Sequence, residues 1–341
     1  MAEIFPVLDL RDADGDTRTR VDFLNRLRVA VHDIGFFQLT GHGVEGADRL
    51  IELCQRFFAR PEQELAAMAM VRSPYFRGYS EVGRERTKGA PDQRGQLDIG
   101  PECEPYVPIP GDPAYRWLAG PNQWPSALPE LRPFVLGWIR QLTEVSYRLL
   151  RLVLAALDTP EDFLDPVVRP NPHVHFKMLH YPGRDEHSEP RQGVGVHKDY
   201  GMLTLLLQDD KGGLQVAVEE GEFLDVPVIP GAFVVNLGEL LEVATRGYLR
   251  ATTHRVVSPP PGVNRYSAPF FYNPRLEATM PSLPSSMVTE AAGVEHDPEN
   301  PFTASYGDNV MRGMVRAFPD VISLHHPELA PCTAPELRSV G

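Results

Sequence analysis

The chain has 341 residues, of which 42% are hydrophobic and 23% are charged, and its formal net charge is −13 at pH 7. A chain of this length can bury a sizeable core, yet it is short enough to form the single elaborated domain that we expect over residues 1–341. The excess of acidic residues argues against nucleic acid as a partner, because phosphate binding relies on clustered Lys and Arg side chains.

The N-terminal part, residues 1–160, is predicted to be rich in helix. Apolar residues recur at helical spacing in three segments, 17–34, 45–59 and 127–157. Gly35 and Gly41 delimit a strand-like segment after the first of them. A region from about 72 to 125 is rich in Pro, Gly and Arg and has weak periodicity. We therefore predict long loops there.

From residue 173 the pattern changes to short β runs. Eight candidate strands are 174–181, 193–199, 203–208, 214–219, 222–227, 232–237, 250–257 and 265–273. Short strands separated by turn signals predict two antiparallel sheets closed as a jelly roll, a double-stranded β-helix core over 173–275. The preceding helices would cover one sheet, and residues 276–341 would form a C-terminal extension. The fold class is mainly β with flanking helices.

Cysteine usage and hydropathy bear on the compartment. The three cysteines are widely separated and form no CxxC pair: Cys54, Cys103 and Cys332. We therefore expect neither a disulfide framework nor a zinc site, and a cytoplasmic location. No apolar run approaches the ~18 residues of a spanning helix, so a membrane is not an expected partner. The N-terminus enters a strand-like segment, and we expect no signal peptide. The oligomeric state is left open.

Two histidines and one aspartate stand at a spacing that suits a metal ion. His197 and Asp199 are positions i and i+2 of strand-like sequence, so both point to one side while Lys198 turns away. His254, 55 residues after Asp199, can approach from a distant strand that folds back alongside. Such a set holds non-haem Fe(II) on one face and leaves the opposite face open for substrate and O2.

Arg265 and Ser267 repeat the same i, i+2 arrangement a few residues beyond the second histidine. A guanidinium and a hydroxyl would share one face of a strand, where they can hold a carboxylate through charge-assisted hydrogen bonds. Alone, Arg265 could equally pair with a surface acid.

These residues and their surroundings resemble one known family, the isopenicillin-N-synthase-like Fe(II)/2-oxoglutarate-dependent oxygenases. The resemblance covers residues 4 to 325 and is strongest in six segments, 5–10, 35–44, 195–201, 212–216, 234–239 and 253–256. It implies that His197, Asp199 and His254 are the iron ligands. It also implies that 2-oxoglutarate is a co-substrate, with its distal carboxylate held by Arg265 and Ser267.

Tyr181 aligns with a family tyrosine that helps to place the iron-side carboxylate of 2-oxoglutarate. The chain departs from the family's common Asn-x-Tyr pattern here, because Leu179 stands where Asn is frequent. A core aromatic at the end of a strand is the alternative interpretation of Tyr181.

The residues that bind the primary substrate are harder to predict. Arg77, Phe76 and Tyr79 lie in a segment that mixes cations with aromatic residues and could fold over the site, and lids are one usual function of long loops. Phe271 follows Arg-x-Ser, where strand alternation sends some side chains towards the pocket. We predict these four as substrate contacts, with Arg77 holding a substrate carboxylate. A solvated loop is the alternative.

Other polar residues have plainer interpretations. Asn236, in a β-branched run, needs a partner and more often has a structural role. His173 and His175 form a His-x-His pair at what we expect to be an edge before the barrel, and we do not predict a second metal there. His325 and His326 are predicted to form a solvated turn.

The expected function is hydroxylation, desaturation or cyclisation of a small metabolite, coupled to decarboxylation of 2-oxoglutarate to succinate and CO2. Three alternatives stay open at this point. The first is an oxidase of the isopenicillin N synthase type, which works without 2-oxoglutarate. The second is an enzyme that breaks 2-oxoglutarate down to ethylene. The third is a jelly-roll binding module without catalysis, which the intact His/Asp/His set disfavours.

Overall fold

The computed structural model describes residues 4–183, 191–219, 221–289, 293–294 and 303–330. Its strands are β1 Val7–Asp9, β2 Phe36–Thr40, β3 Gly78–Ser80, β4 Arg86–Thr87, β5 Ala90–Pro91, β6 Gly95–Ile99, β7 His173–Tyr181, β8 Gln192–His197, β9 Leu203–Gln208, β10 Leu214–Glu219, β11 Glu222–Asp225, β12 Phe233–Leu237, β13 His254–Val257 and β14 Arg265–Asn273. Its α-helices are α1 Thr17–Asp33, α2 Ala47–Phe58, α3 Glu62–Ala67, α4 Leu131–Ala156, α5 Asp165–Val168, α6 Glu239–Ala244, α7 Ser286–Thr289, α8 Tyr306–Ala317 and α9 Pro319–His325. Short 3₁₀ turns cover Leu10–Asp14, Met70–Arg72, Ala114–Leu118 and Pro327–Leu329.

Two facing sheets form the centre of the molecule. The large sheet has the order β1-β2-β12-β9-β14-β7-β6-β3, and the small sheet has the order β11-β10-β13-β8. The pairs are antiparallel except for β1 with β2. This arrangement confirms the predicted double-stranded β-helix with flanking helices.

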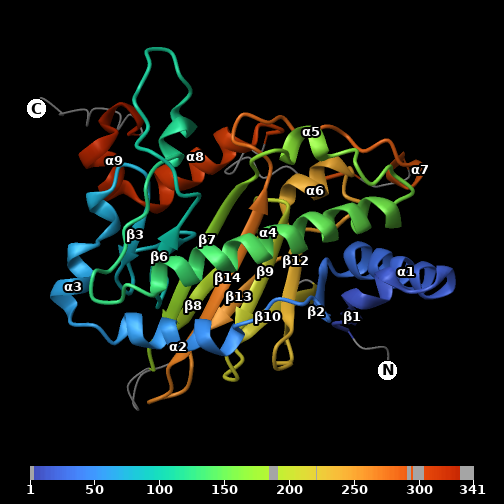
Figure 1. The fold of residues 1–341 in the computed structure, drawn as a ribbon, viewed down its shortest axis with the longest axis horizontal. Helices are drawn as coiled ribbons and strands as arrows, with labels where there is room; N and C mark the ends of the chain where they lie inside the picture. The colour runs from blue at the N-terminus through green and yellow to red at the C-terminus, as the bar shows by residue number, and fades with distance from the viewer. Residues whose placement is uncertain (1–3, 184–190, 220, 290–292, 295–302, 331–341) are drawn as a thin grey trace, which may run out of the picture.

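Apolar side chains separate into two cores, one on each face of the large sheet. The outer core lies between this sheet and helices α1, α2 and α4, and Figure 1 shows α4 as the long green helix that crosses the strands. The inner core lies between the sheets, where Leu179 and Val234 of the large sheet meet Val216 and Val256 of the small one. Successive strand residues alternate between these cores, as the period of two requires. The functional side chains must therefore point inward.

The prediction of long loops for 72–125 was wrong in part. Strands β3 and β6 lie in this region and extend the large sheet beyond β7, with Asp98 opposite Lys177. Strand β7 is consequently an interior strand, and the expectation that His173 and His175 lie at an edge was wrong. Short strands among Pro and Gly residues produce too few repeats of the alternating pattern to be recognised.

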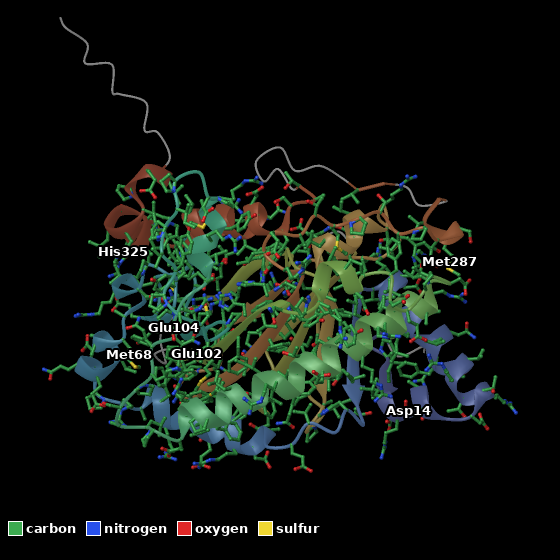
Figure 2. All side chains as sticks on the ribbon, turned by 45° about the horizontal axis from the view of Figure 1, so that its top comes forward. Asp14, Met68, Glu102, Glu104, Met287 and His325 are labelled. Atoms are coloured by element: carbon green, nitrogen blue, oxygen red, sulfur yellow. The ribbon has the colours of Figure 1, made fainter. Side chains whose placement is uncertain are left out.

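The C-terminal elements run along the molecule. Figure 2 shows Met287 of α7 and His325 of α9 at opposite ends. His326 is buried rather than solvated, with its Nε2 2.8 Å from the carbonyl of Pro74 and its ring stacked on Phe76, so the prediction of a solvated turn was wrong for this residue.

In the described part of the chain, no helix combines the length and apolar character needed to cross a bilayer.

Candidate active site

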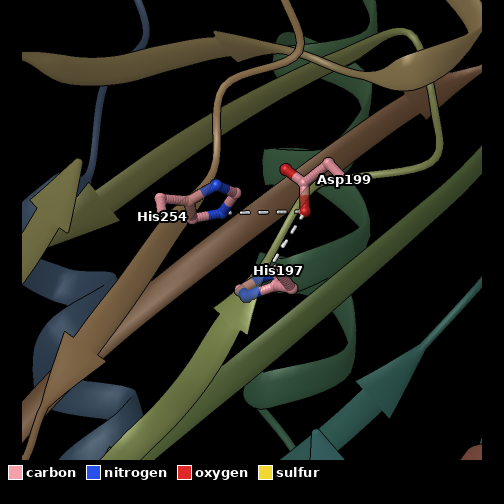
Figure 3. A group of neighbouring side chains, drawn as sticks. All are labelled: His197, Asp199 and His254. Atoms are coloured by element: carbon pink, nitrogen blue, oxygen red, sulfur yellow. Dashed lines mark ion pairs between the residues drawn. The ribbon is translucent and has the colours of Figure 1, made fainter. Parts of the chain in front are cut away.

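Strand pairing brings the two histidines and the aspartate together. His197 ends β8 and His254 begins β13, and the two are register partners across the antiparallel pair. Asp199 follows two residues after β8, and its Oδ1 lies 3.8 Å from His197 Nε2 and 3.9 Å from His254 Nε2 (Figure 3). One ligand atom from each residue lies within 4.8 Å of the others. The three atoms can thus converge on one ion.

Hydrogen bonds hold the two imidazoles in an orientation that suits metal binding. His197 Nδ1 lies 2.7 Å from the carbonyl of Gly195, and His254 Nδ1 lies 3.0 Å from that of Thr252. An Nδ1–H that donates to a carbonyl leaves Nε2 free with its lone pair directed at the ion. The donor set and its outer partners therefore fit Fe(II).

The aspartate is oriented in the same way by two neighbouring strands. Its Oδ2 accepts hydrogen bonds from Thr204 Oγ1 at 2.6 Å and Asn236 Nδ2 at 2.8 Å, which leaves Oδ1 facing the imidazoles. Thr204 was not among the predicted residues, although its inward place on an alternating strand was a signal. Asn236 finds its partner in the carboxylate of Asp199, so its structural role serves the site directly.

Burial and mutual charge set the protonation of these groups. Burial, and then the neighbouring His254, lowers the pKa of His197 to about 4, so its imidazole is neutral near pH 7. Burial alone would raise the pKa of Asp199, but the two imidazoles and the hydrogen bonds from Asn236 and Thr204 outweigh this effect and lower it. Neutral imidazole and ionised carboxylate are the forms that bind metal.

Arg265 is buried on the inner face of β14, with 1% of its surface exposed. Its Nε donates to the carbonyl of Gly212, its Nη2 donates to Gln208 Oε1 at 3.1 Å, and its Nη1 lies 3.3 Å from Ser267 Oγ. Tyr181 packs its ring beneath the guanidinium, 4.7 Å from Cζ to the ring centroid. The structure therefore brings together the three residues predicted for 2-oxoglutarate, and adds Gln208.

The four predicted substrate contacts lie in different places. Phe271 is on the inner face, opposite Thr204 of β9 and His175 of β7. Phe76 is fully buried beside His326, and Tyr79 packs with Phe57 and Phe58 on the outer side of the large sheet. The Arg77 guanidinium is buried, donates to the carbonyls of Tyr75 and Leu118, and has its pKa lowered by burial to about 10. Contact of these residues with substrate stays a prediction.

Comparison with known proteins gives two family matches. Residues 5–127 match the family described as non-haem dioxygenase in morphine synthesis N-terminal, and residues 173–274 match the 2OG-Fe(II) oxygenase superfamily. The chain is 36% identical to the 2-oxoglutarate-dependent dioxygenase frbJ of a Dothideomycetidae species, over 82% of this chain and 76% of the relative. It is 32% identical to homoarginine-6-hydroxylase 2-ODD-C23.1 of Arabidopsis thaliana, over 77% and 80% respectively.

Solved structures agree at the level of the fold. The structure of a putative 2OG-Fe(II) oxygenase family protein from Caulobacter crescentus superposes with a TM-score of 0.74 at 28% identity, over 91% of this chain and 99% of that one. Together with the relatives named for 2-oxoglutarate and the His-Asp-His group, this excludes a binding module without catalysis. The chain belongs to the 2OG-Fe(II) oxygenase superfamily and is a non-haem Fe(II)- and 2-oxoglutarate-dependent dioxygenase that acts on a small molecule.

Proposed function

We propose that His197, Asp199 and His254 bind the catalytic Fe(II) on one face. The observation that carries this assignment is the convergence of their three ligand atoms within 4.8 Å. Each imidazole is also oriented by its Nδ1 facing a backbone carbonyl, and Asp199 is oriented by the hydrogen bonds that its Oδ2 accepts. When bound, the iron supplies the oxidising chemistry, in which O2 converts 2-oxoglutarate to succinate and CO2 and the substrate is oxidised. The protein contributes position and the exclusion of water.

Arg265 is proposed to hold the distal carboxylate of 2-oxoglutarate, with Ser267 and Tyr181 beside it. The guanidinium is directed by Gly212 and Gln208, so its remaining donors have a defined direction in a buried site. Arg265 lies at one end of β14 and Phe271, at the level of Thr204, lies six positions further along. The carboxylate-binding group and the proposed iron ligands are therefore offset along the inner face of the large sheet, and we propose that the co-substrate lies between them.

The anaerobic titration of Fe(II)-loaded protein with 2-oxoglutarate tests these assignments. We expect a weak visible charge-transfer band from chelation of iron by the keto acid, saturating at one equivalent of each. A chain that binds iron through other residues would show the same band in an Asp199→Ala variant, and that result would reject the proposed ligand set.

For the primary substrate, we infer a small polar metabolite, processed by hydroxylation, desaturation or cyclisation. One relative carries the name homoarginine-6-hydroxylase, which supports a polar substrate. The net charge of −13 supports the absence of nucleic acid among the partners, and the wide separation and odd number of the cysteines support a cytoplasmic location. Release of succinate above the rate without substrate, measured across candidate metabolites, tests the substrate class.

A further inference from the structure

The small sheet stops pairing where the proposed iron ligands begin. Strand β8 ends at His197 and β13 begins at His254, and the register between the two strands shifts within β13. Asp199 lies beyond the end of β8. Among the described residues, the ladder between β8 and β13 therefore stops short of the loop that carries Asp199 and of the segment that leads into His254. Other contacts set the distance between these two segments.

Helix α6 lies against the loop that carries the aspartate. The backbone N–H of Glu239, the first residue of this helix, donates to the carbonyl of Asp199 at 2.8 Å. The N–H of Leu240 donates to the carbonyl of Gly201 at 3.1 Å. The same helix carries Glu242, whose side chain is 11% exposed. The backbone of α6 thus fixes the loop, and its buried carboxylate is placed beside the metal-bearing segments.

The carboxylate of Glu242 contacts both of these segments. Its Oε1 accepts from the backbone N–H of Ala251 at 3.1 Å, three residues before His254. Lys198 Nζ lies 3.2 Å from the same Oε1 and 3.0 Å from Oε2. Lys198 is the residue between the two proposed ligands of the first segment. One side chain thus joins the segment that carries two proposed ligands to the segment that carries the third.

The segment that Glu242 holds also orients the second histidine. Ala251 precedes Thr252, whose carbonyl lies 3.0 Å from His254 Nδ1. Thr252 Oγ1 donates to the carbonyl of Ile34, which ties the same residue to the N-terminal part. A displacement of Ala251 would shift the Thr252 carbonyl, and with it the partner that directs the imidazole Nε2 towards the metal. Glu242 therefore bears on the orientation of His254 through one intervening residue.

The ion pair between Lys198 and Glu242 restrains the first segment from the other side. The side chain of Lys198 is 36% exposed, whereas that of Glu242 is 11% exposed and is carried by a helix. A buried carboxylate is stable only when it is paired and hydrogen-bonded, and here both oxygens are used. Since the carboxylate is fixed, the ammonium must come to it. The backbone of Lys198, with a proposed ligand on each side, is held accordingly.

We propose that Glu242 is a positioning residue of the iron centre, which sets the separation of the segment with His197 and Asp199 from the segment with His254. The proposal rests on the proposed function, because it takes these three residues as the iron ligands. Ligands that are held in place lose little freedom when the metal binds, so a folded protein without this contact binds Fe(II) more weakly. A side chain that only stabilised the fold would leave the iron affinity of the folded protein unchanged.

Anaerobic titration with Fe(II), in competition with a chelator of known affinity, tests the proposal. Loss of a hydrogen-bond partner of a metal ligand costs roughly 10- to 100-fold in metal affinity, and Glu242 acts one residue further away, so we expect Glu242→Ala to raise the dissociation constant for Fe(II) by about tenfold. Glu242→Gln retains an acceptor for Ala251 but no charge for Lys198, and its dissociation constant should be intermediate. Glu161→Gln, which breaks an ion pair with Arg20 on the outer helices, is the matched control and should bind Fe(II) like the parent.

A double-mutant cycle tests the route through Lys198. Lys198→Met and Glu242→Gln break the same ion pair, so the double variant should bind Fe(II) no more weakly than the weaker of the two single variants. Independent effects that multiply would reject this route, and an iron affinity like that of the parent in Glu242→Ala would overturn the proposal. Denaturant unfolding of the metal-free proteins confirms that each variant is folded during the titration. If Glu242→Ala does not fold, the cycle decides, and parent-like iron affinity in both single variants overturns the proposal.

The variant Asp199→Ala separates this proposal from the proposed function. If Asp199→Ala loses its iron while Glu242→Ala binds Fe(II) like the parent, the positioning role alone is rejected. If Asp199→Ala retains its iron, the proposed ligand set itself is rejected, and the positioning role with it.

Discussion

At the scale of single residues, the proposed iron ligands are distinguished from other polar side chains by the hydrogen bonds at the atom that does not face the metal site. Each imidazole Nδ1 faces a backbone carbonyl two residues earlier, and Asp199 Oδ2 accepts two hydrogen bonds. Such outer partners fix a ligand before the metal arrives, so that little side-chain freedom is lost on binding.

The first prediction concerns Asp199. Asp199→Ala removes the only carboxylate of the ligand group, so we expect loss of most iron affinity and of 2-oxoglutarate-dependent turnover. Iron stoichiometry after desalting is the measurement. Asp210→Ala, which alters an exposed acid paired with Lys211, is the matched control and should retain one iron per chain. A full iron complement in Asp199→Ala would remove this residue from the ligand set.

The second prediction concerns Arg265. Arg265→Leu should raise the dissociation constant of 2-oxoglutarate roughly 10- to 100-fold, since a hydrogen bond to a charged group contributes roughly 1.5–3 kcal/mol. Arg265→Lys retains the charge but loses the bidentate geometry of the guanidinium. Its dissociation constant for 2-oxoglutarate should therefore lie between those of the parent and of the leucine variant. The charge-transfer band reports binding, and unchanged iron stoichiometry is the control. If both variants bind the co-substrate like the parent, another group holds its distal carboxylate.

At the scale of elements, Arg77 ties the segment before β3 to the 3₁₀ turn Ala114–Leu118. Its guanidinium donates to the carbonyls of Tyr75 and Leu118, 2.7 Å away in the latter case. Arg77→Met leaves a buried acceptor without its donor, so we expect the free energy of unfolding to fall by roughly 1–3 kcal/mol. Denaturant unfolding measures this free energy, and Arg72→Met, which changes an exposed arginine, is the control. Unchanged stability with weaker substrate binding would instead support the predicted substrate contact.

Strand β7 supplies a prediction about pH. Burial lowers the pKa of His173 well below its ordinary value of 6.5, and its Nδ1 lies 2.8 Å from the hydroxyl of Tyr306. Below about pH 6.5 the unfolded chain binds a proton here that the folded chain does not, so stability falls as the pH falls. Between pH 6 and 5, the unfolding free energy of the parent should fall more steeply than that of His173→Gln, by up to about 1.4 kcal/mol per pH unit. Equal slopes would contradict this account.

The elements differ in how well the sequence predicts them. The three long helices and most strands after residue 173 lie within a few residues of their predicted bounds, because each repeats its hydrophobic period several times. The strand predicted over 250–257 forms only from His254 to Val257, and the strand predicted over 193–199 ends at His197. The strands β3 and β6 are too short, and too close to Pro and Gly, to repeat the alternating hydrophobic pattern often enough to be recognised. Likewise, His197 and Asp199 are recognisable from their i, i+2 spacing. Gln208 is not, since its contact with Arg265 depends on two strands that meet only in the folded sheet.

At the scale of the whole molecule, one sheet contains strands from both the N-terminal part and the barrel. Strands β1 and β2 pair beside β12, and β3 and β6 pair beside β7, so the N-terminal part is continuous with the barrel. This continuity supports the proposal of a single domain over the chain. The order of strands cannot be predicted from hydrophobic period, because period specifies which face of a strand is buried and not which strand lies next to it.

The pairing of β2 with β12 has a consequence for biosynthesis. Phe36 is the register partner of Asn236, so two strands that lie 200 positions apart must find each other before the sheet is complete. A ribosome adds roughly 5–20 residues per second, which leaves the β2 edge, with its adjacent phenylalanines, unpaired for on the order of ten seconds or more. Unpaired apolar edges invite association between nascent chains. Helix α1, which is made just before β2 and packs against it, is the part of the chain placed to cover the apolar outer face of that strand while translation continues.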